Sequence, residues 1–458
     1  MAKSKSIYIC NHCGYESPKW TGKCPECGKW NSLEESKPQP KTTKIQKSSS
    51  RVPLLLSTTD LQPQTRLISG IREFDRVLGG GIFHSSVNLI AGDPGIGKST
   101  LLLQVAGALA QKGMSVIFVS AEESFWQIQN RAQRLGLDKL PIPVLVETEL
   151  ENILYQINQV QPQVVVIDSI QAVYTQNAVG APGNVSQIRE CSAQLFRDAK
   201  EKGWSLFLVG HITKEGGIAG PKLLEHTVDV VIYFEGDSFN QYRILRSLKN
   251  RFGPSQEIGL FYMEKDGLKE VTNPSHLFID EPSSNRVGSS VVCSFQGSRP
   301  ILAEVQSLVA RSNYGVPQRT VSGFDHRKLA LLLAILEKHC GLNFSFYDVF
   351  VKIAGGLRMD DPAIDLGISA SLYSSYVNQP LDHQSVYIGE IGLNGQVRTV
   401  SQLDKRVEEA IRLGFHSIFI PAREKLKVSS SSNLNLKPLK HISDFIKKAN
   451  LHNMKCER

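Results

Sequence analysis

The sequence predicts an α/β protein in which a mostly parallel, doubly wound sheet follows a small cysteine-rich module and precedes a second domain with strands and helices of its own. Three observations lead to this prediction. Four cysteines near the N-terminus form two C-x-x-C pairs, apolar strand candidates alternate with helical stretches between residues 87 and 234, and the alternation lapses at 273–290 before strands and helices resume. Alternation of this kind indicates a parallel sheet with helices on its faces.

Composition and charge limit the class of protein. The 458 residues allow two or three domains, and 41% hydrophobic with 21% charged residues is ordinary for globular protein. The longest apolar run, 329–336, is far shorter than a membrane span, so we expect a cytoplasmic chain with no membrane partner. Residues 1–51 hold ten Lys and Arg against four Glu, which fits either a polyanionic partner or a solvated basic tail.

The N-terminal cysteines have metal-ligand spacing. They are Cys10, Cys13, Cys24 and Cys27. Each C-x-x-C turn points two thiolates inward, and two such turns give the tetrahedral sulfur set that Zn²⁺ prefers, with no open position for catalysis. We therefore expect a structural zinc ribbon at 1–34, with an iron–sulfur cluster or a redox dithiol as the alternatives. Residues 35–63, rich in Lys, Ser, Thr, Pro and Gln, predict a basic flexible linker.

The first strand candidate, 87–91, leads into a glycine-rich turn and then an apolar helical stretch. The turn has the G-x-x-x-x-G-K-[ST] spacing of a P-loop. It consists of Gly92, Asp93, Pro94, Gly95, Ile96, Gly97, Lys98, Ser99 and Thr100. Its glycines let backbone N–H groups converge on phosphate, and the helix N-terminus adds a positive dipole end. We expect Lys98 to neutralise the β/γ-phosphates and Ser99 to bind Mg²⁺, so the chain is predicted to hydrolyse a nucleoside triphosphate.

Acidic residues follow two of the strand candidates, at positions where a P-loop enzyme needs a metal ligand and a base. Asp168 follows four apolar β-branched residues, 164–167, and we expect it to hold Mg²⁺ through water. Hydrolysis also needs a group that orients or deprotonates water, and Glu122 and Glu123 follow the strand candidate 116–120. In the RecA-like arrangement this position holds the catalytic glutamate. We prefer Glu122, with Glu123 as the alternative and one of the two as a helix-capping acid.

The ordered set of motifs resembles the bacterial RadA (Sms) family of recombination and repair proteins. The set is the four-cysteine ribbon, the P-loop, the acids, and the segment Lys249-Asn250-Arg251-Phe252-Gly253. The resemblance covers essentially the whole chain. It implies a RecA-like P-loop ATPase domain at 64–272, a linker at 273–290 and a Lon-protease-like α+β domain at 291–458, with ATP, Mg²⁺ and Zn²⁺ as cofactors.

Lys249 and Arg251 are cations at i and i+2, which point the same way on an extended segment. In RecA-like rings of the replicative DnaB type, such cations reach the γ-phosphate bound by a neighbouring subunit. The resemblance therefore implies that both act in trans on charge that develops in the transition state.

Two loops occupy positions that bind single-stranded DNA in the central channel of RecA-like proteins. They are residues 169–183 and 211–222. Lys214 and Lys222 suit phosphate contacts, and Tyr174 suits stacking on a base. His211 resembles a sensor of the γ-phosphate, with a structural histidine as the alternative.

Segments 355–366 and 386–398 are similar to the protease domain of Lon, which uses a Ser-Lys dyad. Here Ala363 stands at the serine position and Asp404 at the lysine position, so acyl-enzyme chemistry has no nucleophile. We expect no peptidase activity, and a role in oligomerisation and DNA binding instead. The surface cations expected to contact DNA are Lys328, Arg358, Lys405 and Arg406.

The resemblance implies an ATP-dependent, homo-hexameric DNA motor in homologous recombination and repair. Such a motor binds single-stranded and branched DNA and promotes branch migration, with a RecA-type recombinase as partner; the ribbon would contact that recombinase or DNA. The alternatives are a Lon-type ATP-dependent protease, which Ala363 disfavours, and a KaiC-like signalling ATPase ring. The ribbon and the single ATPase core favour the DNA motor.

Overall fold

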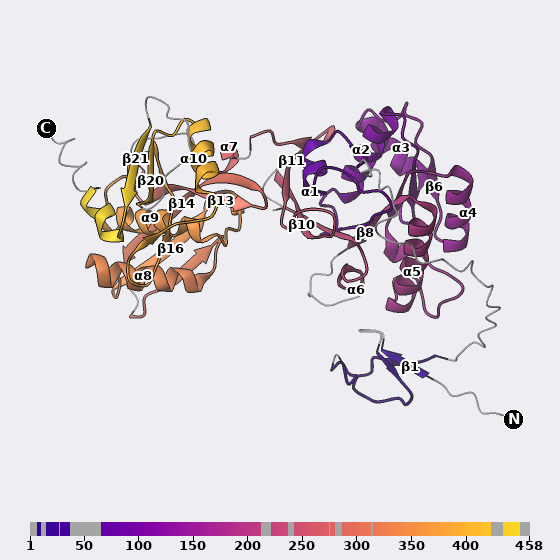
Figure 1. Ribbon diagram of the computed structural model, residues 1–458. Helices are drawn as coiled ribbons and strands as arrows, with labels where there is room; N and C mark the ends of the chain where they lie inside the picture. Colours follow the sequence, from indigo (N-terminus) through magenta and orange to yellow (C-terminus); the bar gives the residue numbers. More distant parts are fainter. Residues whose placement is uncertain are drawn as a thin grey trace, which may run out of the picture. The chain divides into compact units, whose positions relative to one another are not determined.

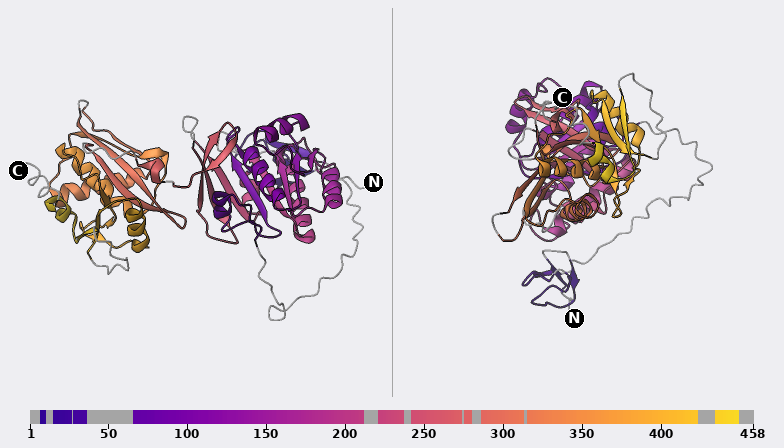
Figure 2. Two further views of the ribbon diagram at one scale, coloured as in Figure 1. Left: turned by 90° about the horizontal axis from the view of Figure 1, so that it is seen from above. Right: turned by 90° about the vertical axis from the view of Figure 1, so that its left-hand side faces the viewer.

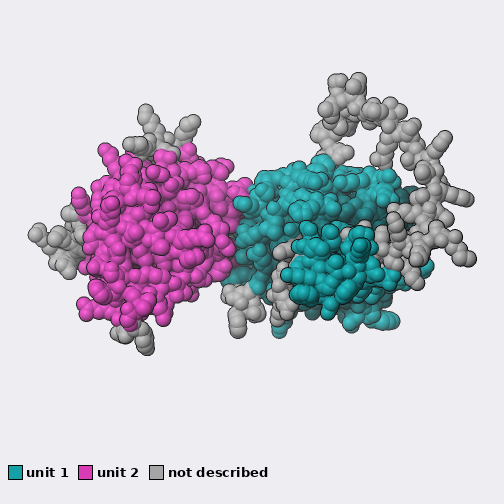
Figure 3. All heavy atoms as spheres, turned by 90° about the horizontal axis from the view of Figure 1, so that it is seen from below, with its two compact units in different colours: residues 1–271 teal, residues 272–458 magenta. Residues whose placement is uncertain are grey.

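The computed structural model describes residues 7–10, 15–26, 28–36, 66–211, 221–236, 242–273, 275–279, 286–312, 315–422 and 434–448. The chain divides into two compact units, Met1–Val271 and Thr272–Arg458, drawn in two colours in Figure 3. Most of the linker expected at 35–63, and residues 280–285 of the linker expected at 273–290, lie outside the described residues.

Residues 7–36 form a small antiparallel sheet, labelled at β1 in Figure 1. The strands are β1 (Ile7–Cys10), β2 (Glu16–Ser17) and β3 (Leu33–Ser36), with β1 in the middle. The first cysteine of each pair makes the same backbone hydrogen bond: the Cys10 amide donates to the carbonyl of Tyr15 and the Cys24 amide to that of Lys29, each at 2.9 Å. The predicted ribbon fold is confirmed.

The P-loop domain is built on a nine-stranded sheet within the described residues. The order is β12-β11-β10-β9-β4-β8-β7-β5-β6, and the strands from β9 to β6 are parallel, whereas β10, β11 and β12 are antiparallel. The strands are β4 (Val87–Gly92), β5 (Val116–Ser120), β6 (Val144–Val146), β7 (Val164–Asp168), β8 (Ser205–His211), β9 (Val230–Glu235), β10 (Tyr242–Asn250), β11 (Ile258–Glu264) and β12 (Gly267–Glu270). The mostly parallel, doubly wound sheet is confirmed.

Helices cover both faces of this sheet (Figures 1 and 2). They are α1 (Arg72–Val77), α2 (Lys98–Gln111), α3 (Phe125–Arg134), α4 (Leu150–Val160), η2 (Ile170–Ala172), α5 (Val185–Lys202) and α6 (Pro221–Glu225). Local sequence sets several boundaries. Ser124 and Gln127 form a capping box at the start of α3, and the Asn184 side chain accepts the Ser186 amide at the start of α5.

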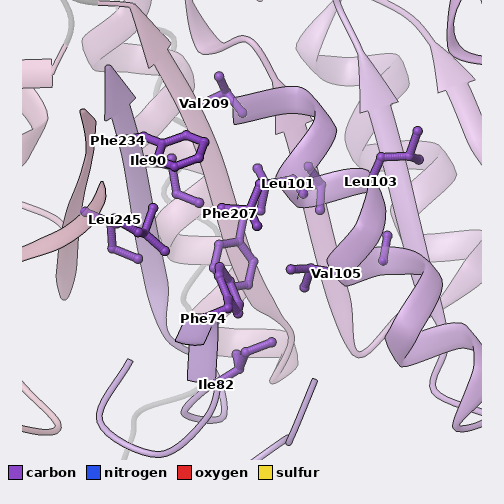
Figure 4. Close-up of a cluster of buried hydrophobic side chains, with 14 of the residues drawn as sticks. Phe74, Ile82, Ile90, Leu101, Leu103, Val105, Phe207, Val209, Phe234 and Leu245 are labelled. Carbon is purple, nitrogen blue, oxygen red and sulfur yellow. The ribbon is translucent and has the colours of Figure 1, made fainter. Parts of the chain in front are cut away.

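Side chains of the central strands alternate between two cores. Val164 and Val166 of β7 enter a cluster packed by α1, α2 and α3, whereas Val165 and Ile167 enter a cluster packed by α4 and α5. Figure 4 shows the first cluster, in which Phe74 lies beside Phe207 with ring centroids 5.8 Å apart. Because both faces of these strands are buried, their sequences are continuous apolar runs.

The second unit contains a seven-stranded mixed sheet within the described residues, in the order β15-β16-β14-β13-β17-β20-β21, and a hairpin of β18 and β19. The strands are β13 (Ser289–Gln296), β14 (Arg299–Arg311), β15 (Arg319–Ser322), β16 (Tyr347–Ile353), β17 (Ser385–Tyr387), β18 (Glu390–Ile391), β19 (Val397–Arg398), β20 (Ser417–Pro421) and β21 (Asn435–Leu439). The helices are α7 (Ser275–Phe278), α8 (His326–Cys340), η3 (Ala354–Gly356), η4 (Pro362–Ile364), α9 (Asp365–Val377) and α10 (Leu403–Arg412). The predicted α+β class is confirmed.

Ala363 and Arg406 both lie in the interior of this unit. Ala363, on η4, is buried in an apolar cluster with Leu403 and Val407 of α10. The Arg406 side chain is 1% exposed, and its Nη1 lies 2.7 Å from Asp361 Oδ2. Its guanidinium also donates to two backbone carbonyls, at 2.7 and 3.0 Å. The expectation that Arg406 is a surface cation is therefore wrong.

The helical period explains this correction. Buried positions of α10 are 403, 406, 407 and 410, which is the i, i+3, i+4, i+7 stripe of a core-facing helix. The other three cations differ among themselves. Lys328 is largely buried in an ion pair with Asp365, Nζ to Oδ1 2.7 Å, whereas Arg358 and Lys405 are exposed.

We expect Arg406→Ala to destabilise the second unit by about 3 kcal/mol, because the largely buried carboxylate of Asp361 loses its ion-pair partner and keeps the amides of Phe295 and Ala363. Arg358→Ala is the control, since Arg358 is 72% exposed and pairs with an exposed Asp360. Hydrogen exchange of amides in β13 and α10 across a urea titration measures the change. Equal midpoints for the two variants would contradict the expectation.

Candidate functional site

The P-loop connects the fully buried β4 to the N-terminus of α2 through left-handed backbone. Gly95 and Gly97 have φ of 77° and 114°, values that side chains disfavour. Gly92 is required for a different reason: a Cβ there would lie 2.3 Å from the carbonyl oxygen of Phe234 on the adjacent β9. The turn can therefore hold its backbone against a phosphate, because first-turn amides of a helix have no intrahelical acceptor.

Lys98 lies inside this turn. The residue is 3% exposed, and its Nζ donates to the carbonyls of Gly92 (2.8 Å) and Asp93 (2.9 Å). Burial lowers the pKa of Lys98, while the nearby carboxylates of Asp168 and Glu122 act in the opposite direction. The ammonium is therefore held by weak neutral acceptors in a place where a phosphate oxygen would be a stronger one.

Asp168 ends β7 beside the start of α2. It is 7% exposed, and its carboxylate accepts a hydrogen bond from the side chain of Ser99. Burial raises the pKa of Asp168, the Ser99 hydrogen bond lowers it, and the negative charges of Glu122 and Glu123 raise it further. A carboxylate and a hydroxyl that already meet are a fitting pair of oxygen ligands for Mg²⁺, whose charge would favour the ionised acid.

Glu122 and Glu123 follow β5 but have different partners. Glu122 is exposed, and its carboxylate accepts a hydrogen bond from the hydroxyl of Ser169, the residue after Asp168. The carboxylate of Glu123 pairs instead with Arg131 on α3, Oε1 to Nη2 2.5 Å. Glu122 is thus held beside the end of β7, next to Asp168, whereas Glu123 is paired with α3.

Three supporting residues were not identified from the sequence. Ser169 and Arg131 hold the two glutamates, and Arg243 of β10 donates from Nε to the carbonyl of Ile96 in the P-loop at 3.3 Å. Ser169 directly follows the predicted acid, so its position was a usable signal. Arg243 belongs to no motif. It lies near the P-loop because of the order of the strands in the sheet, which the sequence does not give.

The segment 249–251 lies at the opposite edge of the sheet from the P-loop of the same chain. Asn250 pairs with Val230 on β9, and Val230 pairs with Asn88 near the start of β4. Gly92 lies four residues further along β4, which corresponds to about 13 Å. Lys249 and Arg251 therefore cannot contact a phosphate bound to their own P-loop.

The side chains of Lys249 and Arg251 differ in how tightly they are held. Lys249 Nζ donates to three carbonyls within residues 225–228, at 2.7 to 3.2 Å. Arg251 Nη1 lies 3.4 Å from Asp229 Oδ1, and the Arg251 side chain is 53% exposed. Burial and the neighbouring charge of Arg251 lower the pKa of Lys249. Arg251 presents a charged group to solvent, whereas Lys249 caps the chain after α6.

Other members of the K-N-R-F-G segment build its turn. The Asn250 side chain accepts the Phe252 amide at 2.9 Å, and Phe252 stacks on Phe83 with centroids 4.0 Å apart and planes 7° apart. Arg66 donates to the Phe252 carbonyl. The segment is thus one rigid turn that carries Arg251.

The loop 169–183 is organised by polar side chains rather than by cations. The Gln187 amide on α5 binds the backbone of Thr175, Ala178 and Gly180 at 2.9 to 3.1 Å. Tyr174 exchanges backbone hydrogen bonds with residues 148–150, and its side chain is half-buried. Most of the second expected loop lies outside the described residues. This applies to residues 212–220, which include Lys214, and to the side chains of His211 and Lys222.

The metal ligands can be followed in part. Cys10 and Cys24 are buried together with Leu33, each at the start of its turn. Cys13 and Cys27 lie outside the described residues, and no group of three or more possible ligands occurs among the residues that are described. Two inward-facing thiols at the starts of matching turns fit one metal ion bound between the turns.

Comparison with known proteins gives consistent results along the chain. The model of the rubredoxin metal binding domain matches residues 8–35, that of KaiC matches 67–142, and that of subunit ChlI of Mg-chelatase matches 310–424. The DNA repair protein RadA of Bacillus subtilis is 48% identical over 428 residues, covering 92% of this chain and 93% of the relative. That of Listeria monocytogenes is 44% identical, covering 98% and 99%.

Solved structures resemble the chain only in part. The ATPase domain of G40P matches with a TM-score of 0.40 at 17% identity over 45% of this chain, and the KaiC-like protein PH0186 of Pyrococcus horikoshii with 0.39 at 20% over 46%. Similarity at this level supports no functional inference. Among helices in the described ranges, none has the length and apolar character needed to cross a membrane.

We expect Asp168→Asn to raise the thermal midpoint of the nucleotide-free protein without added Mg²⁺, more at pH 8 than at pH 5. A carboxyl whose pKa is higher in the folded chain costs stability when ionised, and the cost vanishes as the pH falls toward its ordinary pKa of about 4. Differential scanning calorimetry measures it, with the exposed Asp138→Asn as control. A lower midpoint at pH 8 would mean that the Ser99 hydrogen bond outweighs burial.

Proposed function

This chain belongs to the family of the DNA repair protein RadA, and we propose that it is an ATP-driven motor of recombination and repair that binds single-stranded DNA and promotes branch migration. The observation that carries the proposal is a divided site. Lys98, Asp168 and Glu122 gather at one edge of the sheet, while Arg251 is presented at the opposite edge. Two copies of the chain are then needed for one complete site.

In this proposal each residue of the P-loop edge has one task. Lys98 leaves two carbonyl acceptors for the β/γ-phosphate oxygens, and Ser99 and Asp168 hold Mg²⁺. The bound Mg²⁺ supplies charge neutralisation at the phosphates. Glu122, oriented by Ser169, positions the attacking water and accepts its proton.

Arg251 is the better candidate for action in trans. Its guanidinium is exposed and held by one long ion pair, so it can reach the phosphate of an adjacent copy. Lys249 is held by three carbonyls, and we assign it to the support of the turn. A contact between opposite edges of identical chains is heterologous, and its repetition forms a ring where the rotation between copies closes. We propose a closed homo-hexamer.

The remaining assignments concern the metal, the DNA substrates, the protein partner and the second unit. We propose that the ribbon holds Zn²⁺ through Cys10, Cys13, Cys24 and Cys27, that single-stranded and branched DNA are the substrates, and that a RecA-type recombinase is a partner. The second unit serves as a platform, because its Ala363 offers no nucleophile. The signalling alternative rests on a KaiC match limited to 67–142, whereas the RadA relatives match nearly the whole chain.

We expect ATP hydrolysis by the wild type to rise when single-stranded DNA is added. Glu122→Gln should lower the rate by about 100-fold or more, since it removes the proton acceptor, whereas Glu123→Gln should keep most of it because Glu123 pairs with Arg131. Phosphate release with and without oligonucleotide measures this, with Lys98→Ala as the inactive control.

Three outcomes would count against these assignments. A rate indifferent to DNA would favour the signalling ATPase. An inactive Glu123→Gln beside an active Glu122→Gln would exchange the roles of the two acids. ATP-stimulated casein cleavage by the pure protein would support the protease despite Ala363.

Mixing two inactive variants tests action in trans. Arg251→Ala carries an intact P-loop, and Lys98→Ala carries an intact Arg251, so mixed rings contain some complete sites. We expect partial recovery of hydrolysis after subunit exchange, with a maximum near equal proportions. Hydrolysis that stays at the sum of the separate variants would contradict the divided site.

A further inference from the structure

The ribbon exposes two indole rings that flank one glycine. Trp20 and Trp30 are 52% and 72% exposed. A Cβ built on Gly22 would lie 3.6 Å from Cζ3 of Trp30 and 3.8 Å from Cη2 of Trp20. Both rings therefore border a position without a side chain, and both keep a large part of their surface in solvent.

The scaffold holds these rings in place. Trp30 faces Lys23 in an antiparallel bridge, and the Asn31 amide donates to the Gly22 carbonyl at 2.8 Å. The hairpin between them is closed by the turn that starts at Cys24. Trp20 Nε1 donates to the Leu33 carbonyl at 3.1 Å, which ties the other indole to β3. Aromatic groups ordered in advance lose little conformational entropy when they bind.

Cations accompany the rings. The ammonium of Lys23 lies 5.9 Å from the centroid of Trp30, as expected for cross-strand neighbours on one face. Lys19 directly precedes Trp20 and Lys29 directly precedes Trp30, and both are exposed. A ligand stacked on Trp30 would thus meet the ammonium of Lys23 next to the ring, and Lys19 and Lys29 add two exposed positive charges to the ribbon.

We propose that Trp20 and Trp30 form a stacking site for single-stranded DNA on the ribbon. Exposed aromatic faces next to lysines suit unpaired bases linked by phosphates, and stacking tolerates any base sequence. Tryptophan is enriched at protein–protein interfaces but lysine is depleted there, so the exposed Lys19, Lys23 and Lys29 favour a polyanion over a protein ligand. Bases of a duplex are already stacked on one another, so single strands are the preferred ligand. The inference shares with the proposed function only its DNA ligand, and it requires neither ATP hydrolysis nor a ring.

The test uses the full chain with zinc and without nucleotide, and measures the anisotropy of a short fluorescein-labelled oligo(dT). Trp30→Ala should weaken binding by about 5- to 100-fold, the loss of one stacked base, and Trp30→Tyr should restore most of it. Trp126→Ala is the matched control, because Trp126 on α3 is 71% exposed. Trp30→Ala should leave the salt dependence of binding unchanged, whereas Lys23→Ala should lower its slope by about one.

A second measurement detects the site even where other parts of the chain dominate DNA affinity. In a Trp126→Phe background the remaining tryptophans are those of the ribbon and Trp204, which is 3% exposed. Oligo(dT) should quench the emission, and replacement of Trp20 and Trp30 by Phe should remove that quenching. Zinc content checks that each variant keeps its ribbon.

The results separate this inference from the proposed function. Unchanged affinity in Trp30→Ala together with absent quenching would overturn the stacking site alone, if DNA still stimulates hydrolysis. Loss of a recombinase interaction in Trp30→Ala, with DNA binding intact, would overturn it in favour of a protein-docking site. Tryptophan-dependent DNA binding without DNA-stimulated hydrolysis would instead overturn the proposed motor and leave the stacking site standing.

Discussion

Strand direction is the constraint on which the site of the first unit depends. The parallel strands β4, β5 and β7 end at one edge, so the P-loop, Glu122 and Asp168 converge there without being near in sequence. The antiparallel β10 runs the other way and carries Arg251 to the opposite edge. A single reversal of direction thus separates the two halves of the proposed catalytic set. The proposed catalytic set therefore requires two copies of the chain, because about 13 Å along β4 separates its two halves.

Much of this arrangement is predictable from the sequence, since buried parallel strands are long apolar runs and the P-loop has a fixed spacing. The strand candidates at 87–91, 116–120 and 164–168 correspond to β4, β5 and β7. The short β6 and the antiparallel β10, β11 and β12 were not predicted. β6 has three residues and β12 four, and charged residues interrupt the apolar positions of β10, whereas the apolar run of β11 was a usable signal that was missed. Position 406 was misjudged from its charge, although the helical stripe that includes it was present in the sequence.

The choice between Glu122 and Glu123 shows what sequence cannot supply. When two glutamates are adjacent at the end of a strand, the sequence does not indicate in which direction each side chain points. The structure distinguishes them through partners distant in sequence: Ser169 for Glu122, and Arg131, eight residues along on the next helix, for Glu123.

The buried cations Lys98 and Arg406 also differ in their partners. Lys98 donates to two backbone carbonyls, which a phosphate oxygen could replace, whereas Arg406 is paired with a carboxylate. The first site retains capacity for an anion, and the second is closed.

The three hydrogen bonds of Lys249 have a mechanical consequence. They fasten the turn that carries Arg251 to residues 225–228, at the end of α6. Arg251 and the end of α6 are therefore not mechanically independent, because any displacement of this turn would be transmitted to residues 225–228 through the Lys249 ammonium.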